Sequence, residues 1–491
     1  MRRSLFLLVL LTASVACSTN PVSGKREFSL VSEKQEIAMG QEGNVEVLRE
    51  YGVYNEKPQL NQLVDHLGKK LAAVSDRPNL DWHFAILDSP IVNAMALPGG
   101  YIYVTRGIME RMNSEDELAG VIAHEVSHVA ARHQARSMSQ QQLAQIGMVL
   151  GSVAIGPAAS QAYGSLIQLG AGLLFTRYSR QQESQADLLG TAYMTEAGFN
   201  PKGAENMLLA LQRLEGTKGG GVERYFIDHP DPVKRVADVR HEIGGLQQRN
   251  PVIGTQPLDR ALVPRMEGVI TGGSTLETTI RDNVAYNRRY GIIATPPRGW
   301  MVSTEPGALF VMSPMRATGE SLIVQEVPIQ KLQQFASAQN AVRAQLQQMG
   351  LQYVNSGVAR TSTGQQLNVD LWSGNTERGQ VTVESTQMVE QDNALIFLQI
   401  SQAGSGGRGL MGVLGDLRFD RAAARAVEPP RIHVVTSRSG DRWDDLARRA
   451  TGRPEDAEAI AKINGYDYPS AVPVGVSIKL PQDLVREINN R

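Results

Sequence analysis

The sequence predicts a multidomain chain: a mainly α-helical domain with a small sheet, then a small α+β domain, then a βααβ module. Three observations support this prediction. The chain has 491 residues, more than one hydrophobic core usually serves. Helical periodicity dominates up to about residue 245, and strand-like runs dominate from about 285 to 420. The last sixty or so residues follow a third pattern.

The composition excludes several classes of protein and of site. The 49 lysines and arginines balance 50 aspartates and glutamates, so we expect no nucleic-acid partner. The single cysteine, Cys17, excludes an intramolecular disulfide and a cysteine-based zinc site. Any metal must therefore be held by histidine and carboxylate side chains.

Residues 1–16 have the pattern of a secretory signal peptide. A basic start is followed by seven apolar residues, LFLLVLL, which are too few to span a bilayer, and then by small residues before Cys17. This ending resembles the lipobox of bacterial lipoproteins. The resemblance implies that Cys17 is acylated and anchors the mature chain to a membrane, and Ser18 points to the outer membrane of a Gram-negative bacterium. A signal peptide with an incidental cysteine is the alternative.

Residues 31–250 are expected to form the first domain, after a polar tether at 17–30. Its elements are predicted from periodicity and from turn residues. We expect helices at about 32–49 and 58–73, strands at 82–87 and 100–105 joined through a Pro98-Gly99-Gly100 turn, and helices from about 114 to 245.

A zinc-binding motif lies in the first of these later helices. His124-Glu125-Val126-Ser127-His128 is an H-E-x-x-H sequence, and a Ser-x-x-Glu capping box at 114–117 begins its helix. Two histidines four residues apart lie one turn apart on one helix face, so they can share one Zn²⁺. Glu125 points about 100° away from His124 and can reach a water beside the metal without being a ligand.

Two histidines leave a zinc ion short of a third protein ligand. The position of the third metzincin histidine is Gln134 here, and His133 is expected on the surface. Glu183 and Asp187 lie four residues apart on a later helix that we expect to end near Gly198. Glu183 can bind the metal, while Asp187 can accept a hydrogen bond from a ligating histidine.

The order of these motifs is that of a known family. The segment 93–105, H-E-x-x-H, Glu183-x-x-Ala186-Asp187 and His229-Pro230-x-x-x-x-Arg235 follow one another along the chain. This pattern resembles the HtpX/BepA-like zinc metallopeptidases, in their periplasmic lipoprotein branch, over about residues 20–245. The resemblance implies a gluzincin-type metalloprotease with one zinc ion per chain. It assigns as metal ligands His124, His128 and Glu183.

The same resemblance assigns Glu125 as the catalytic base and Asp187 as a second acidic residue. Family accounts make that aspartate a proton donor, whereas helical geometry favours a role in orienting a ligand. His229 is implied either to stabilise the transition state or to cap the metal in a latent form. A histidine that only begins a helix is the third possibility.

Two further segments bear on substrate access. An edge strand and turn that contain Ala94, Met95, Gly99 and Gly100 could pair with an extended substrate through its backbone. Residues 137–176 contain no charged side chain, so they could form a mobile lid over the site. Core helices packed through small residues are the equal alternative.

The remainder of the chain carries less chemical information. A linker is expected at 251–284, where prolines recur, and an α+β domain of unknown role at 285–425. Its strands are predicted at 308–312, 321–327, 380–386 and 394–400, with a helix at about 331–349. Residues 430–482 resemble a LysM module, which implies binding to the glycan of peptidoglycan. A packing domain without glycan binding is the alternative.

Taken together, these patterns predict a zinc endopeptidase lipid-anchored in the periplasm. Its expected substrates are unfolded or misassembled envelope proteins, which would be cleaved as quality control, and outer-membrane assembly machinery is a further expected partner. A chaperone-like outer-membrane assembly factor that keeps the fold is one alternative. The complete set of ligands with Glu125 argues against it as the sole role, but both roles can coexist. A cell-wall hydrolase is the other, and no wall-hydrolase metal motif supports it.

Overall fold

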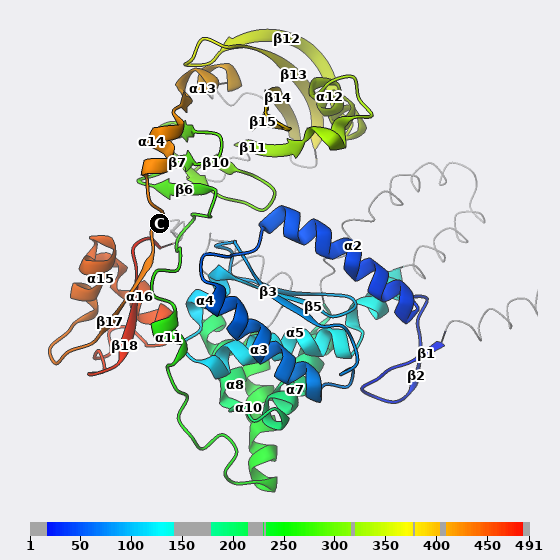
Figure 1. The fold of residues 1–491 in the computed structure, drawn as a ribbon, viewed down its shortest axis with the longest axis vertical. Helices are drawn as coiled ribbons and strands as arrows, with labels where there is room; N and C mark the ends of the chain where they lie inside the picture. The colour runs from blue at the N-terminus through cyan, green and yellow to red at the C-terminus, as the bar shows by residue number, and fades with distance from the viewer. Residues whose placement is uncertain are drawn as a thin grey trace, which may run out of the picture. The chain divides into compact units, whose positions relative to one another are not determined.

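The computed structural model describes residues 17–141, 178–214, 229, 232–315, 320–376, 379–402 and 409–484 (Figure 1). The chain divides into two compact units. The first contains residues up to 269 together with 433–480, and the second contains 270–432 and the residues from 481 onward. None of the helices within the described ranges is long and apolar enough to cross a membrane.

The part of the first unit from residue 31 to 269 is helical with one small sheet, as the sequence predicts. Its helices are α2 (Glu33–Tyr51), α3 (Pro58–Val74), α4 (Arg106–Arg111), α5 (Glu115–Ala130), α7 (Arg180–Glu196), α8 (Lys202–Gln212), α10 (Pro232–Arg249) and α11 (Leu262–Arg265). Its sheet contains β3 (His83–Leu87), β4 (Ala94–Leu97) and β5 (Tyr101–Thr105). The tether expected at 17–30 contains a hairpin, β1 (Cys17–Thr19) and β2 (Arg26–Phe28). The signal peptide and most of the uncharged segment 137–176 lie outside the described residues.

The small sheet has β5 at its centre, in the order β3-β5-β4. β5 runs parallel to β3 and antiparallel to β4, so β4 is an edge strand beside α5. The turn between β4 and β5 depends on glycine. Gly99 and Gly100 have φ values of 80° and 105°, and an added Cβ on Gly100 would lie 2.9 Å from the carbonyl oxygen of Asp81.

Helix α5 is buried along nearly its whole length and forms the centre of the first unit. Its N-cap is Ser114, whose hydroxyl accepts from the Glu117 amide at 3.0 Å, as the capping-box sequence predicts. The Glu117 carboxylate accepts from the amide of Asn113 at 2.6 Å rather than from that of the N-cap itself. α7 crosses α5 closely at Gly190, where an added Cβ would lie 3.2 Å from the His124 amide nitrogen.

The second unit is rich in sheet. A seven-stranded antiparallel sheet has the order β12-β13-β14-β15-β11-β10-β9, and a four-stranded sheet has the order β16-β8-β7-β6. The strands of the larger sheet are β9 (Trp300–Ser303), β10 (Phe310–Pro314), β11 (Ser321–Pro328), β12 (Gln352–Arg360), β13 (Gln366–Thr376), β14 (Gly379–Glu390) and β15 (Asn393–Gln402). Those of the smaller sheet are β6 (Thr278–Arg281), β7 (Val284–Asn287), β8 (Ile292–Ala294) and β16 (Arg418–Phe419).

The helices of this unit are α12 (Ala338–Gln348), α13 (Leu410–Asp416) and α14 (Arg421–Ala426). The helix expected from residue 331 begins later than predicted. Ile329–Leu332 form a separate 3-10 turn, and Ser337 caps α12 by accepting from the Asn340 amide at 3.1 Å. The strands predicted in this region are present with longer or shifted bounds.

The C-terminal module has the predicted βααβ order. It consists of β17 (Ile432–Thr436), α15 (Trp443–Thr451), a 3-10 turn (Pro454–Asp456), α16 (Ala457–Ile463) and β18 (Ser477–Pro481). Residues 433–480 of it are part of the first unit. The buried Lys479 ammonium donates to the carbonyl oxygens of Glu110 and Met112 at 2.6 and 2.8 Å, and Arg260 donates to that of Asn464 at 3.2 Å. The module is therefore fastened to the helix that precedes α5.

We predict that Gly190→Val forces α7 away from α5, because the added side chain has no room beside the backbone of Ala123 and His124. The free energy of unfolding should fall by about 1–3 kcal/mol, and zinc affinity should fall with it. Urea unfolding and zinc titration measure both. Gly244→Val on α10 is the matched control, since nothing lies within 4 Å of its added Cβ. A Gly190→Val protein with wild-type stability and zinc affinity would contradict the prediction.

Candidate metal centre

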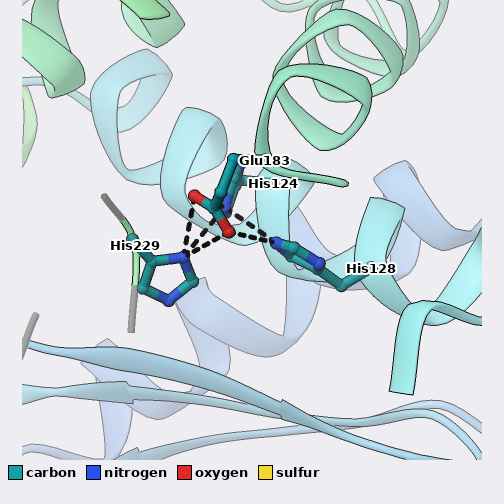
Figure 2. A group of neighbouring side chains, drawn as sticks. All are labelled: His124, His128, Glu183 and His229. Atoms are coloured by element: carbon teal, nitrogen blue, oxygen red, sulfur yellow. Dashed lines mark hydrogen bonds and ion pairs between the residues drawn. The ribbon is translucent and has the colours of Figure 1, made fainter. Parts of the chain in front are cut away.

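Four buried side chains converge on one point in the first unit (Figure 2). His124 and His128 come from α5, Glu183 comes from the first turn of α7, and His229 precedes α10. One nitrogen or oxygen of each lies within 4.8 Å of the other three. The structure therefore brings the three sequence-predicted ligands together and adds His229 to them.

The spacing of these donor atoms fits a tetrahedral zinc ion. Nε2 of His124 lies 3.0 Å from Nε2 of His128 and 3.3 Å from Nδ1 of His229. The Glu183 carboxylate lies 3.1 Å from His229 Nδ1, 3.4 Å from His128 Nε2 and 3.6 Å from His124 Nε2. Zinc bonds of about 2.0–2.1 Å in a tetrahedron separate the ligand atoms by roughly 3.3 Å.

The two carboxylates of α7 have separate surroundings one helical turn apart. The side chain of Asp187 lies 2.9 Å from Nδ1 of His124, on the ring side opposite the cluster. This placement is the orienting position that helical geometry favours in the sequence. The guanidinium of Arg235, on α10, donates to both Asp187 oxygens at 2.6 and 2.8 Å and lies 2.8 Å from Glu183 Oε2.

Arg235 lowers the pKa of both carboxylates, and His229 adds to the effect on Glu183. Burial alone would raise the pKa of Asp187, but Arg235 outweighs burial and lowers that pKa to about 2. His229 and Arg235 likewise overcome burial and hold the pKa of Glu183 well below its ordinary value. Both groups are therefore anions at neutral pH. Arg235 is part of the His-Pro motif by resemblance, but the sequence assigns it no role; its spacing after His229 is the signal that marks it.

The expectation that His133 lies on the surface is wrong. Its side chain is fully buried, and its Nδ1 lies 2.9 Å from Nδ1 of His128. Counting about 100° per residue fails here because α5 ends at Ala130 and Arg132 adopts a left-handed φ of 54°. Burial lowers the pKa of His133 to about 4, so its ring is neutral at neutral pH.

Glu125 stands beside the donor set without belonging to it. The residue is 1% exposed, and its Oε1 lies 3.8 Å from Nε2 of His229. Among the described residues, no donor lies within hydrogen-bonding distance of its Oε2. Burial raises the pKa of Glu125 above its ordinary value. A buried carboxylate oxygen without a protein donor is a position that an ordered water molecule can satisfy.

The remaining predicted site residues lie on the sheet and at the N-terminus. Ala94 and Met95 are on the edge strand β4, and Gly99 and Gly100 form the turn after it. Gln134 donates from Nε2 to the carbonyl oxygen of Ala96, in the same strand, at 2.7 Å. Cys17 begins β1.

Comparison with known proteins finds similarity over this region. Residues 58–243 match the family described as Peptidase family M48. The chain is 30% identical over 221 residues to the mitochondrial metalloendopeptidase OMA1 of Schizosaccharomyces pombe. The matched stretch covers 45% of this chain and 64% of that relative. It is 31% identical over 230 residues to the beta-barrel assembly-enhancing protease of Yersinia pestis, a match that covers 45% of this chain and 46% of that relative.

The corresponding Escherichia coli K12 protein is 30% identical over 235 residues, which are 46% of this chain and 47% of that relative. The chain thus spans between about half and two thirds of the length of these curated relatives. The family and the buried histidine–glutamate cluster together imply zinc as the metal.

We predict that Arg235→Met strongly destabilises the metal-free protein, because it leaves two buried carboxylates without their cation. The expected loss in the free energy of unfolding is about 3–5 kcal/mol, and zinc content should fall. Urea unfolding with chelator present measures the first effect. Arg240→Met is the control on the same helix: Arg240 pairs with Glu205 but is 62% exposed, so its loss should cost less than about 1 kcal/mol. Equal losses for the two variants would contradict the assigned role of Arg235.

Proposed function

We propose that this chain, whose residues 58–243 form an M48 peptidase region, is a zinc-dependent endopeptidase that cleaves proteins of the bacterial cell envelope. The observation that carries the proposal is the pairing of a buried four-donor cluster with the adjacent Glu125 carboxylate, whose Oε2 has no donor among the described residues. A structural metal site has no use for such a carboxylate, whereas peptide hydrolysis needs a base at this place.

The chemistry divides between the metal and the side chains. Zinc bound by His124, His128 and Glu183 would lower the pKa of a bound water to about 7 and polarise a peptide carbonyl. Glu125 accepts the proton of the attacking water and later passes it to the leaving amine. Its raised pKa suits the second step, because a buried carboxylate holds the proton more firmly than an exposed one.

The edge strand β4 supports a substrate that is extended. It lies beside α5 at the end of the three-stranded sheet, so a peptide could add to it through backbone hydrogen bonds. Backbone pairing reads little side-chain sequence, which suits unfolded or misassembled proteins. The relatives named as beta-barrel assembly-enhancing proteases favour envelope proteins as the substrates here too.

Location and partners follow from the N-terminus and the C-terminal module. We infer that Cys17 carries the lipid anchor that holds the enzyme at the periplasmic face of the outer membrane; mass spectrometry of the N-terminal peptide tests the acylation. The βααβ order at 432–481 is compatible with a LysM module that binds peptidoglycan. Digestion of casein and of purified peptidoglycan side by side separates the endopeptidase from a cell-wall hydrolase and from a purely chaperone-like assembly factor.

His229 is proposed to act as a latch. Its Nδ1 lies among the donor atoms, where it would take the fourth coordination position that a catalytic zinc site keeps open. Its Nε2 faces Glu125, so the latched ring also lies where the attacking water must stand. With His229 at the donor cluster the enzyme is in a resting state, and the His229 ring must move away before a substrate carbonyl can approach.

We predict that Glu125→Gln keeps the zinc ion and abolishes proteolysis. The amide has the shape of the carboxylate but cannot accept the proton of the attacking water, and Glu125 is outside the donor set. Elemental analysis and casein cleavage of the purified variant measure the two effects. Loss of zinc together with loss of activity would mean that Glu125 is a ligand or a structural group.

We predict that His229→Ala cleaves casein faster than the wild type at equal zinc occupancy, because the fourth coordination position becomes open to water. If His229 instead stabilised the transition state, the rate would fall by roughly 10²-fold or more. Initial rates of casein cleavage, normalised to bound zinc, distinguish the two. An unchanged rate would leave His229 with a structural role alone.

A further inference from the structure

In each of the two ligating histidines of α5, the two ring nitrogens have different roles. The nitrogen that faces the metal must offer a lone pair, so the other nitrogen carries the proton and needs an acceptor. Both rings direct Nε2 toward the cluster, where the two atoms lie 3.0 Å apart. Each Nδ1–H must therefore be satisfied on the far side of its ring.

The two acceptors differ in charge. For His124 the acceptor is the carboxylate of Asp187, at 2.9 Å from Nδ1. For His128 the atom at 2.9 Å from Nδ1 is Nδ1 of His133. We propose that His133 is a positioning residue for the metal centre: a neutral imidazole that accepts the proton of His128 and so keeps Nε2 of that ring directed at the metal. The proposal rests on the zinc site of the proposed function.

The far side of His133 completes the assignment of protons. A neutral imidazole that accepts at one nitrogen donates from the other, and Nε2 of His133 lies 3.2 Å from Oε1 of Gln185. Gln185 is on α7, midway between Glu183 and Asp187. The chain of hydrogen bonds thus runs from His128 on α5 through His133 to the helix that supplies the third ligand.

Stacking alone cannot do what this hydrogen bond does. The ring of Tyr178 lies over that of His128, with centroids 3.7 Å apart and planes at 21°. This contact fixes the plane of the imidazole but is nearly the same after a half-turn of the ring, which would direct carbon instead of nitrogen at the metal. The acceptor on His133 distinguishes the two orientations, because only one of them places Nδ1–H against it.

The charges of the site explain why the acceptor is neutral. Three carboxylates lie buried at the centre, on Glu125, Glu183 and Asp187, and one arginine, Arg235, opposes them. A divalent zinc ion supplies the two remaining positive charges. A carboxylate at position 133 would add a buried negative charge without a partner, at a cost of several kcal/mol per ion, whereas a histidine provides the acceptor without the charge.

Zinc release to a chromogenic chelator tests the proposal without reference to peptide cleavage. His133→Phe fills the space but offers no acceptor, so we expect release about 10- to 100-fold faster than in the wild type. His133→Asn can place Oδ1 close to the position of Nδ1, so it should release zinc within about threefold of the wild-type rate. His66→Phe, at an exposed position on α3, is the control for the change of residue type.

The variants also separate positioning from packing. Thermal melting of the metal-free proteins reports on the stability of the fold. The His133→Asn variant should retain zinc better than His133→Phe even if its melting temperature is lower. A Phe variant that holds zinc as the wild type does, or an Asn variant that releases it as fast as Phe, would overturn the proposal. If Phe does not fold, the release rate of the Asn variant decides in the same way. Casein cleavage is measured separately: a wild type that retains zinc but cuts no protein would refute the proposed function and leave this inference intact.

Discussion

The metal centre depends on one guanidinium. Arg235 donates hydrogen bonds to Asp187 and forms an ion pair with Glu183, and these two carboxylates lie one turn apart on α7. Without a cation between them, two anions in a buried site would repel each other and would lose their hydration with no compensation. Arg235 keeps Asp187 ionised toward His124, and His229 and Arg235 together keep Glu183 ionised toward the metal position. The same contact holds α10 against α7, so fold and site share one interaction.

Sequence periodicity predicts the parts of the site that lie on regular helices. His124, His128, Glu183 and Asp187 are pairs four residues apart, and the spacing alone places each pair on one helix face. Periodicity fails where the backbone leaves the helix. His133 follows a left-handed Arg132, and so its direction cannot be counted from the motif. The position of His229 depends on a tertiary contact that no local pattern contains, and the order of the motifs along the chain places it only by resemblance.

The sequence predicts the elements of the first unit well, but it does not predict the strand order of the second unit. The helices and strands of the first unit follow from apolar periodicity, caps and the glycine turn, because each of these signals acts within a few residues. The seven-stranded sheet of the second unit depends on pairing between distant strands, such as β11 with β15, so its order cannot be obtained from runs of residues. The helix expected from residue 331 begins at 338 because Ser337 supplies a side-chain cap that the periodicity does not register.

A cluster with four protein donors looks at first like a structural zinc site, since such sites are closed. The surroundings argue otherwise. A structural site would gain nothing from a further buried carboxylate, and burying one without a full set of donors costs free energy. Glu125 is nonetheless 1% exposed, with one oxygen that no described residue bonds. Oε1 of Glu125 faces Nε2 of His229, and Nδ1 of the same histidine lies against the Glu183 carboxylate. In the proposed latch, the side chain of His229 therefore covers both the fourth metal position and the base, as expected of a catalytic centre held closed at rest.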